Sequence, residues 1–150
     1  MNIALFIVNV HPDPLCTQRL SQGDYRINKE LNDEWIDLQN QSEYTINLQK
    51  RVLVSLRQRD ATTLQILKRA ELNSPSPIPL YSGEKIRIFT GEQPSSSTHI
   101  PDSDGVNRVI WIAQKTYLWV PIAEEAQLYF SMEDLNRKRP PLARLRYRMD

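Results

Sequence analysis

The hydrophobic residues of this chain fall in short runs separated by prolines and glycines, and several runs alternate apolar and polar residues with a period of two. Such alternation is typical of strands that bury one face. Val52, Val54 and Leu56 share a face in this way. The pattern predicts eight short strands, at Ile3–Val10, Glu34–Gln39, Arg51–Arg57, Thr63–Leu67, Lys85–Thr90, Arg108–Ile112, Gln127–Ser131 and Arg144–Met149.

Two segments, residues 60–72 and 123–138, fit either a strand or a short helix. The first opens with Asp60, a candidate helix N-cap, and continues with Leu64, Leu67 and Glu71 at helical spacing. The second carries apolar residues at positions i, i+4 and i+7, which are Leu128, Met132 and Leu135. With about eight strands and at most a short helix, the chain is predicted to be an all-β sandwich or barrel.

Length and composition exclude several classes of protein. The 150 residues fit one domain, and the single cysteine, Cys16, rules out an internal disulfide. The four glycines are too far apart for a dinucleotide-binding fingerprint, a P-loop or a nucleophile elbow. Two histidines and one cysteine are too few for a structural zinc site of the usual kind.

Positive charge is concentrated at the C-terminal end. Residues 1–136 have a net charge of −4, whereas residues 137–150 have a net charge of +5. We therefore predict a sandwich over 1–136 and a basic extension over 137–150 that contributes the last strand. Its basic residues are Arg137, Lys138, Arg139, Arg144, Arg146 and Arg148.

The last three arginines alternate along the predicted final strand, so they share one face at a spacing of about 6.6–6.8 Å. Such a face could bind an acidic protein or the phosphates of a nucleic acid. The alternative is an edge strand whose charges prevent pairing with another sheet. Both interpretations stay open at the level of the sequence.

Three sequence blocks occur in the order typical of one known family. They are Glu34-Trp35-Ile36-Asp37-Leu38-Gln39-Asn40, then Ser82-Gly83-Glu84-Lys85-Ile86-Arg87-Ile88-Phe89-Thr90-Gly91, and then Trp111 through Trp119 to Ala126-Gln127-Leu128. In these blocks the chain resembles the lamin tail domain, over roughly residues 3–131. It departs from the family at Ser82, where proline is usual, and at 120–125, where the family tends to have a polar turn.

The resemblance implies an immunoglobulin-like β-sandwich without a catalytic residue. Lamin tail domains of eukaryotic lamins bind proteins and DNA, and similar bacterial domains accompany secreted or membrane-associated hydrolases. The blocks also predict structural roles for particular residues. Asn40 closes its strand with a side-chain turn, Gly83 and Gly91 supply turn conformations with positive φ, and Trp111 and Trp119 fill the core.

No spacing of polar residues matches a known catalytic or metal motif. Two loop clusters were the best candidates, His11 with Asp13 and Cys16, and His99 with Asp102 and Asp104. We therefore expect no enzyme activity, catalytic residue, metal or cofactor, and no small-molecule substrate.

The functional expectation is a non-enzymatic module that binds another protein through the basic last strand and nearby aromatics such as Trp35. Sequence-independent nucleic-acid binding through the same arginines is the alternative. The apolar N-terminal run lacks the cationic start of a signal peptide and is shorter than the roughly 20 residues of a membrane span. We therefore expect no membrane partner and a cytoplasmic location, where the free Cys16 is stable.

Overall fold

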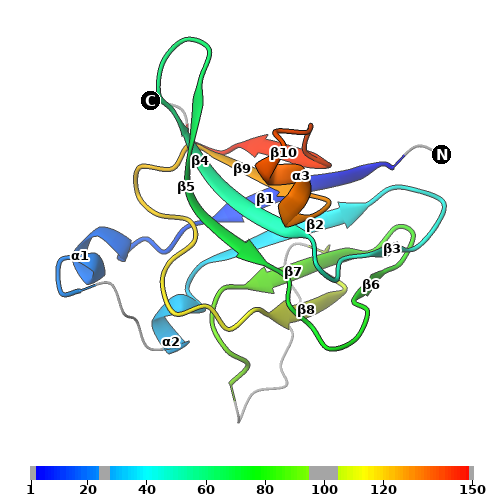
Figure 1. The fold of residues 1–150 in the computed structure, drawn as a ribbon. Helices are drawn as coiled ribbons and strands as arrows, with labels where there is room; N and C mark the ends of the chain where they lie inside the picture. The colour runs from blue at the N-terminus through cyan, green and yellow to red at the C-terminus, as the bar shows by residue number, and fades with distance from the viewer. Residues whose placement is uncertain (1–2, 24–27, 95–104, 149–150) are drawn as a thin grey trace.

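A computed structural model describes residues 3–23, 28–94 and 105–148. Two four-stranded sheets pack face to face, and two very short strands pair beside them (Figure 1). The first sheet has the order β1-β2-β7-β8, and its last two strands are parallel whereas the other neighbours are antiparallel. Its strands are β1 (Leu5–His11), β2 (Trp35–Asn40), β7 (Lys85–Phe89) and β8 (Arg108–Trp111).

The second sheet is antiparallel and has the order β10-β9-β4-β5. Its strands are β10 (Ala143–Arg146), β9 (Glu125–Tyr129), β4 (Val52–Gln58) and β5 (Leu64–Glu71). The all-β sandwich is thus confirmed, and every predicted strand is present with bounds shifted by a few residues. The sequence did not predict the separate two-residue pair, β3 (Ile46–Asn47) and β6 (Pro79–Leu80).

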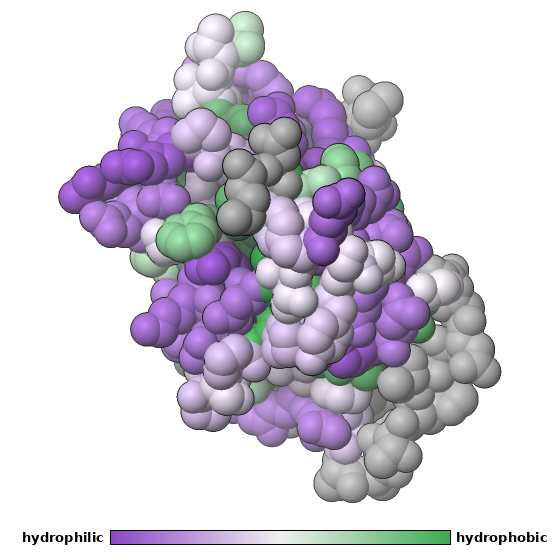
Figure 2. All heavy atoms as spheres, turned by 90° about the vertical axis from the view of Figure 1, so that its right-hand side faces the viewer, coloured by the Kyte–Doolittle hydropathy of each residue, from purple (hydrophilic) through white to green (hydrophobic). Residues whose placement is uncertain are grey.

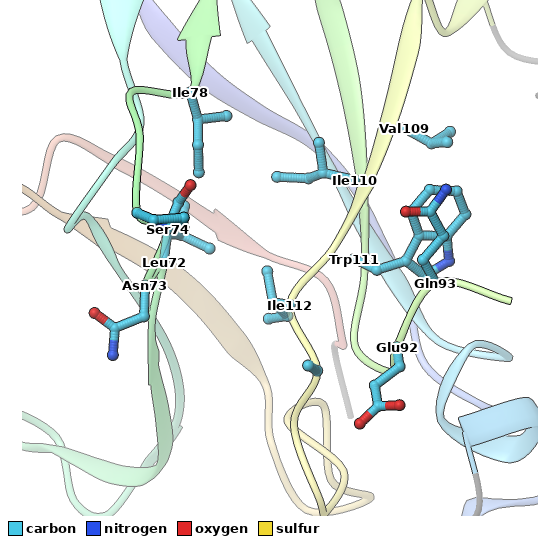
Figure 3. A pocket seen from close by; sticks show the side chains of 12 residues that line it. Leu72, Asn73, Ser74, Ile78, Glu92, Gln93, Val109, Ile110, Trp111 and Ile112 are labelled. Carbon is cyan, nitrogen blue, oxygen red and sulfur yellow. The ribbon is translucent and has the colours of Figure 1, made fainter. Parts of the chain in front are cut away.

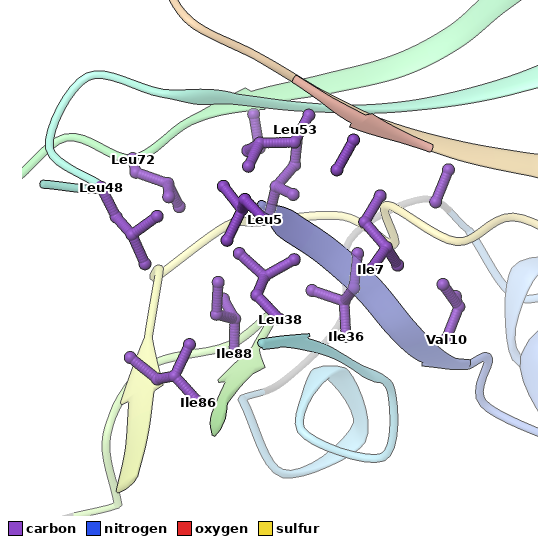
Figure 4. Packing of buried hydrophobic residues seen from close by; sticks show 14 of the residues in the cluster. Leu5, Ile7, Val10, Ile36, Leu38, Leu48, Leu53, Leu72, Ile86 and Ile88 are labelled. Atoms are coloured by element: carbon purple, nitrogen blue, oxygen red, sulfur yellow. The ribbon is translucent and has the colours of Figure 1, made fainter. Parts of the chain in front are cut away.

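The main hydrophobic core lies between the two sheets (Figure 4). Ile36 and Leu38 point into it from β2, and Leu53 meets them from β4. A β-bulge between Ile7 and Asn9 shifts the register of β1. Because a bulge adds one residue to a strand, it lets both Ile7 and Val10 bury although they are three positions apart.

The central strand β4 is buried on both faces. Leu53 belongs to the main core, whereas Val52, Val54 and Leu56 form a second cluster on the opposite face. Helix α3 (Met132–Asn136) covers that cluster with Leu135. The segment 123–138 therefore contains both predicted alternatives, first β9 and then this one short helix.

Helix α3 begins directly after a serine, which the sequence analysis did not identify as a cap. Ser131 is its N-cap, and the Ser131 Oγ accepts a hydrogen bond of 3.1 Å from the backbone N–H of Asp134. A serine in this position satisfies a backbone donor that has no partner inside the helix.

Segment 60–72 is a strand and not a helix. The Asp60 carboxylate accepts hydrogen bonds of 2.9 Å from the backbone N–H groups of Thr62 and Thr63. Asp60 therefore closes the turn between β4 and β5 and caps no helix. An aspartate that bonds its own chain two residues on is equally typical of a turn, which is why the sequence left both structures open.

Two short helices, α1 (Cys16–Leu20) and α2 (Asn28–Leu31), lie at the end of the sandwich away from β3 and β6 (Figure 1). Within the described ranges, no helix is both long and apolar enough to cross a membrane.

Of the five residues with expected structural roles, Asn40, Gly83 and Trp119 have the expected geometry, whereas Gly91 and Trp111 do not. Gly83 has a φ of 79°, and Trp119 is fully buried in the main core. Gly91 does not have a positive φ, and its N–H instead donates to Asn32 Oδ1 at 2.9 Å. Trp111 is only half-buried and lies outside the core, because the inward positions are taken by its neighbours Ile110, on β8, and Ile112, directly after it.

Asn40 ends β2 with a fully buried side chain that holds three backbone groups. Its Oδ1 accepts from the N–H of Ser42 at 2.8 Å. Its Nδ2 donates to the carbonyls of Tyr44 and Leu80, at 2.8 and 2.9 Å. The predicted side-chain turn is therefore present, and it also ties β2 to β6.

We expect Asn40→Ala to lower the free energy of unfolding by about 3 kcal/mol, because it leaves buried donors and acceptors without partners. Urea denaturation of the variant and the wild type measures this loss. Gln41→Ala is the matched control, since Gln41 is exposed and bonds other described residues through its backbone N–H alone. It should change stability by less than about 0.5 kcal/mol. Equal stability of both variants would contradict the role of Asn40.

Candidate functional site

The basic residues of β10 lie next to carboxylates of the preceding strand. Arg144 and Arg146 are exposed on one face of β10, opposite Gln127 and Glu125 of β9. Arg146 Nη2 is 2.9 Å from Glu124 Oε2, and Arg144 Nε is 3.8 Å from Glu125 Oε2. Each of these two guanidinium groups therefore has an acidic neighbour within ion-pair distance.

Arg148 does not continue this row, because β10 ends at Arg146. Its guanidinium instead donates to backbone carbonyls of the segment that leads into β9, those of Val120 at 2.9 Å and of Pro121. The three arginines thus do not form a line of unpaired cations. Arg148 fixes a loop, and two exposed arginines remain on the strand.

The basic run 137–139 follows α3 and is partly paired with that helix. Arg137 Nη2 is 2.9 Å from Glu133 Oε1, and Arg139 Nε is 3.8 Å from Asp134 Oδ1. Lys138 is exposed, and no ion pair of its side chain occurs among the described residues. The acidic residues around the C-terminal extension therefore compensate much of the charge that the sequence concentrates there, which weakens its long-range attraction for a polyanion.

Trp35, the predicted aromatic contact, belongs to a row of rings that crosses the first sheet. The ring of His11 stacks on Trp35 at 3.9 Å between centroids, and Phe89 contacts Trp35 edge-on at 5.7 Å. Phe89 in turn stacks on Trp111 at 5.7 Å. Each strand of the sheet contributes one ring, and β-sheet pairing places these residues in register.

This arrangement makes Trp35 an internal member of the row. Its ring is half-buried between its neighbours, and the guanidinium of Arg87 lies 4.7 Å from its centroid. Arg87 also forms a buried bidentate pair with Asp37, at 2.8 and 2.9 Å. The outermost ring of the row is Trp111, on the terminal strand β8.

A hollow of about 530 Å³ lies beside β8 (Figure 3). Contacts between β1 and β10 close one margin of the sandwich. At the opposite margin the terminal strands β8 and β5 leave the hollow between them. One wall comes from the segment after β5, and the other comes from β8, the residues directly after it and the segment after β7. The lining residues are Leu72, Asn73, Ser74, Pro75, Ile78, Glu92, Gln93, Val109, Ile110, Trp111, Ile112 and Ala113.

The apolar residues that line the hollow are continuous with the main core. Ile78, Ile110 and Ile112 are only partly buried, yet they pack against the core cluster. In Figure 3 the side chains of Ile110 and Ile112 point across the hollow toward Leu72 and Ile78. By contrast, the face in Figure 2 is mainly hydrophilic with small separated hydrophobic spots. The hollow is therefore a place where core side chains remain accessible.

The residues of the hollow were not predicted as a site. The alternation of Val109, Ile110, Trp111 and Ile112 indicates a strand with two apolar faces, which is the one signal in the sequence. That this strand ends its sheet opposite Leu72 and Ile78 depends on contacts between distant segments. No local pattern carries that information.

The cluster of His11, Asp13 and Cys16 does not form a reactive centre. His11 stacks on Trp35, while the buried Asp13 accepts hydrogen bonds from Arg19 Nη1 at 2.7 Å and from the Tyr117 hydroxyl. Burial raises the pKa of the Cys16 thiol to about 12, with Glu34 and Asp13 adding to the shift. Such a thiol stays protonated at neutral pH and is a poor nucleophile. The other cluster, His99, Asp102 and Asp104, lies outside the described residues.

Glu34 is a fully buried carboxylate that bridges three segments. It accepts hydrogen bonds from Thr90 Oγ1 at 2.7 Å and from the backbone N–H groups of Leu118 and Trp119 at 2.8 and 3.2 Å. Burial raises its pKa to about 7, although these hydrogen bonds oppose the shift. Glu34 fixes the start of β2 to the segment that carries Trp119 into the core.

No known protein-family model matches this chain, and no curated protein matches it. The resemblance to lamin tail domains therefore stays a prediction from the three sequence blocks.

The raised pKa of Glu34 predicts a pH-dependent stability. Because folding raises this pKa from 4.5 to about 7, the folded state holds its proton more tightly. The stabilisation that this proton provides is complete below pH 4.5 and is lost as the pH rises through 7. The free energy of unfolding should fall by about 3 kcal/mol over that range. Glu34→Gln removes this titration, so the free energy of unfolding of the variant should depend less on pH.

Urea denaturation at pH 5 and pH 8 tests this expectation, read as the difference between wild type and variant at each pH. Glu43→Gln, at an exposed position, is the control and should follow the wild type. A difference between wild type and Glu34→Gln that is equal at both pH values would rule out the titration of Glu34 as the cause.

Proposed function

We propose that this protein is a non-catalytic, immunoglobulin-like module of the lamin-tail type that binds another protein at the hollow beside β8. The observation that carries the proposal is the hollow itself, where Ile78, Ile110 and Ile112 of the core margin remain accessible. Accessible apolar surface rimmed by polar residues is a common mark of protein interaction sites. The polar rim consists of Asn73, Ser74, Glu92 and Gln93.

Supporting features come from the sequence and from the surface. The order of the three lamin-tail blocks favours an interaction domain. The half-buried Trp111 at the hollow is of the residue type that most often anchors protein partners. The volume of about 530 Å³ accommodates a few side chains of a partner and lies within the usual range of binding pockets.

Display of random twelve-residue peptides on phage tests whether the hollow binds polypeptide. We expect selected peptides to bind the wild type and to bind Gln93→Trp at least about tenfold more weakly, because a larger side chain at this exposed rim position obstructs the hollow. Gln41→Trp is the matched control at an exposed position outside it. Failure to select any peptide, or equal affinity for all three proteins, would overturn the proposal.

Nucleic-acid binding through the basic extension is the competing function. The acidic neighbours of Arg137, Arg139, Arg144 and Arg146 argue against it. We expect fluorescence anisotropy of labelled DNA and RNA to show no binding at about 50 mM salt, for the wild type or for Arg144→Ala/Arg146→Ala. Binding that falls steeply toward about 200 mM salt and disappears in the double variant would make nucleic-acid binding the function, in place of protein binding.

A further inference from the structure

The backbone of β8 has one edge that no described strand occupies. On its other edge, β8 pairs with β7, and directly after the strand Ile112 donates its N–H to the Phe89 carbonyl at 3.1 Å. In a parallel pair alternate residues bond the same neighbour, so Ile110 also faces β7 while Val109 directs its N–H and carbonyl away from it. Val109 therefore offers one donor and one acceptor at the edge beside the hollow.

This edge is less protected than that of the second sheet. Proteins usually guard an edge strand with charged side chains or bulges. The edge strand β5 has exposed Lys68 and Arg69, and its ladder with β4 contains a register shift. On β8 the one charged residue, Arg108, is held 2.8 Å from Glu84 and also bonds the Pro79 carbonyl. The residues Val109–Trp111 that follow carry no charge.

The two faces of β8 define the side chains that an added strand would need. On the inner face, Ile110 and Ile112 look across the hollow to Leu72 and Ile78 (Figure 3). On the outer face, Trp111 ends the row of rings that crosses the sheet. Since side chains alternate along a strand, an incoming segment would place apolar residues inward and an apolar or aromatic residue against Trp111.

Charge adds a further requirement. Glu92 is the single ionisable residue among the described residues that line the hollow, and its ion pair with Lys115, at 3.4 Å, is largely exposed. An exposed pair of this kind contributes little stability and can be shared with a second cation. A basic residue in the incoming segment is therefore favoured near Glu92, and an acidic residue is repelled.

We propose that the partner of this module binds as an extended segment that adds a strand to the free edge of β8, with apolar residues at alternate positions and a lysine or arginine near Glu92. This inference rests on the proposed function, since it specifies how the hollow is occupied. Strand addition supplies affinity through main-chain hydrogen bonds and specificity through pockets for alternate side chains.

The test uses the peptides selected by display and reads the backbone of the full chain. When a peptide saturates the protein, amide hydrogen exchange followed by NMR should slow at least about tenfold at Val109. Ile110, whose amide already faces β7, should change much less. Side-chain docking in the hollow would not produce this contrast between neighbouring amides.

Two substitutions at Val109 separate backbone from side chain. Val109→Pro removes the outward N–H and should weaken peptide binding about tenfold or more, whereas Val109→Ile keeps the N–H and should bind nearly as the wild type. Proline is tolerated on the open side of an edge strand, and circular dichroism checks that the variant is folded. If it does not fold, peptides N-methylated at alternate positions serve the same purpose, with loss of binding expected at the positions that face β8.

A charge exchange tests the chemistry of the segment. Selection on Glu92→Lys should enrich acidic residues where selection on the wild type enriches lysine or arginine. Peptides without basic enrichment would overturn the charge requirement. Peptides blocked by Gln93→Trp but insensitive to Val109→Pro and to N-methylation would overturn strand addition and leave the proposed function standing. If no peptide binds, both strand addition and the proposed function are overturned.

Discussion

The carboxylate of Glu34 is the contact on which the arrangement of the sandwich most depends. It joins the start of β2 to Thr90, at the end of β7, and to the backbone at Leu118 and Trp119. These groups are 56 to 85 positions away in the sequence. Trp119, one of the largest fully buried side chains, is placed by that contact. A buried carboxylate is stable in such a place only because donors surround it.

Ion pairs at the surface explain how a chain with a strongly basic end has an ordinary surface. The extension supplies cations, while α3, β9 and the residue before β9 supply the carboxylates next to them, which are Glu124, Glu125, Glu133 and Asp134. The guanidinium of Arg148 donates hydrogen bonds to backbone carbonyls. Charge that looks concentrated along the chain is therefore largely balanced in space, and each exposed pair contributes little stability by itself.

The two margins of the sandwich differ, and this difference directs attention to β8. Contact between β1 and β10 covers the core at one margin, whereas β8 and β5 leave it accessible at the other. The row of rings from His11 to Trp111 ends at the accessible margin. A strand edge that no described strand occupies, an apolar hollow and an aromatic terminus thus coincide in one place, which is what an extended ligand would need.

The sequence alone predicted the eight strands of the two larger sheets, because period-two alternation is a local property and burial of one face enforces it. The turns at Asn40 and Gly83 were also predictable, since side-chain chemistry and backbone freedom at single residues decide them. The lamin-tail resemblance pointed to a sandwich, although local signals could not choose between helix and strand at 60–72.

Only the tertiary structure decided which way Trp111 faces, what partners Gly91 and Arg148 have, and where the sandwich stays open. Each depends on residues far away in the chain, such as Asn32 for Gly91 and Val120 for Arg148. Register between strands then fixed the row of rings and the accessible edge of β8. Such contacts are set by how whole sheets pack, so no short stretch of sequence could encode them.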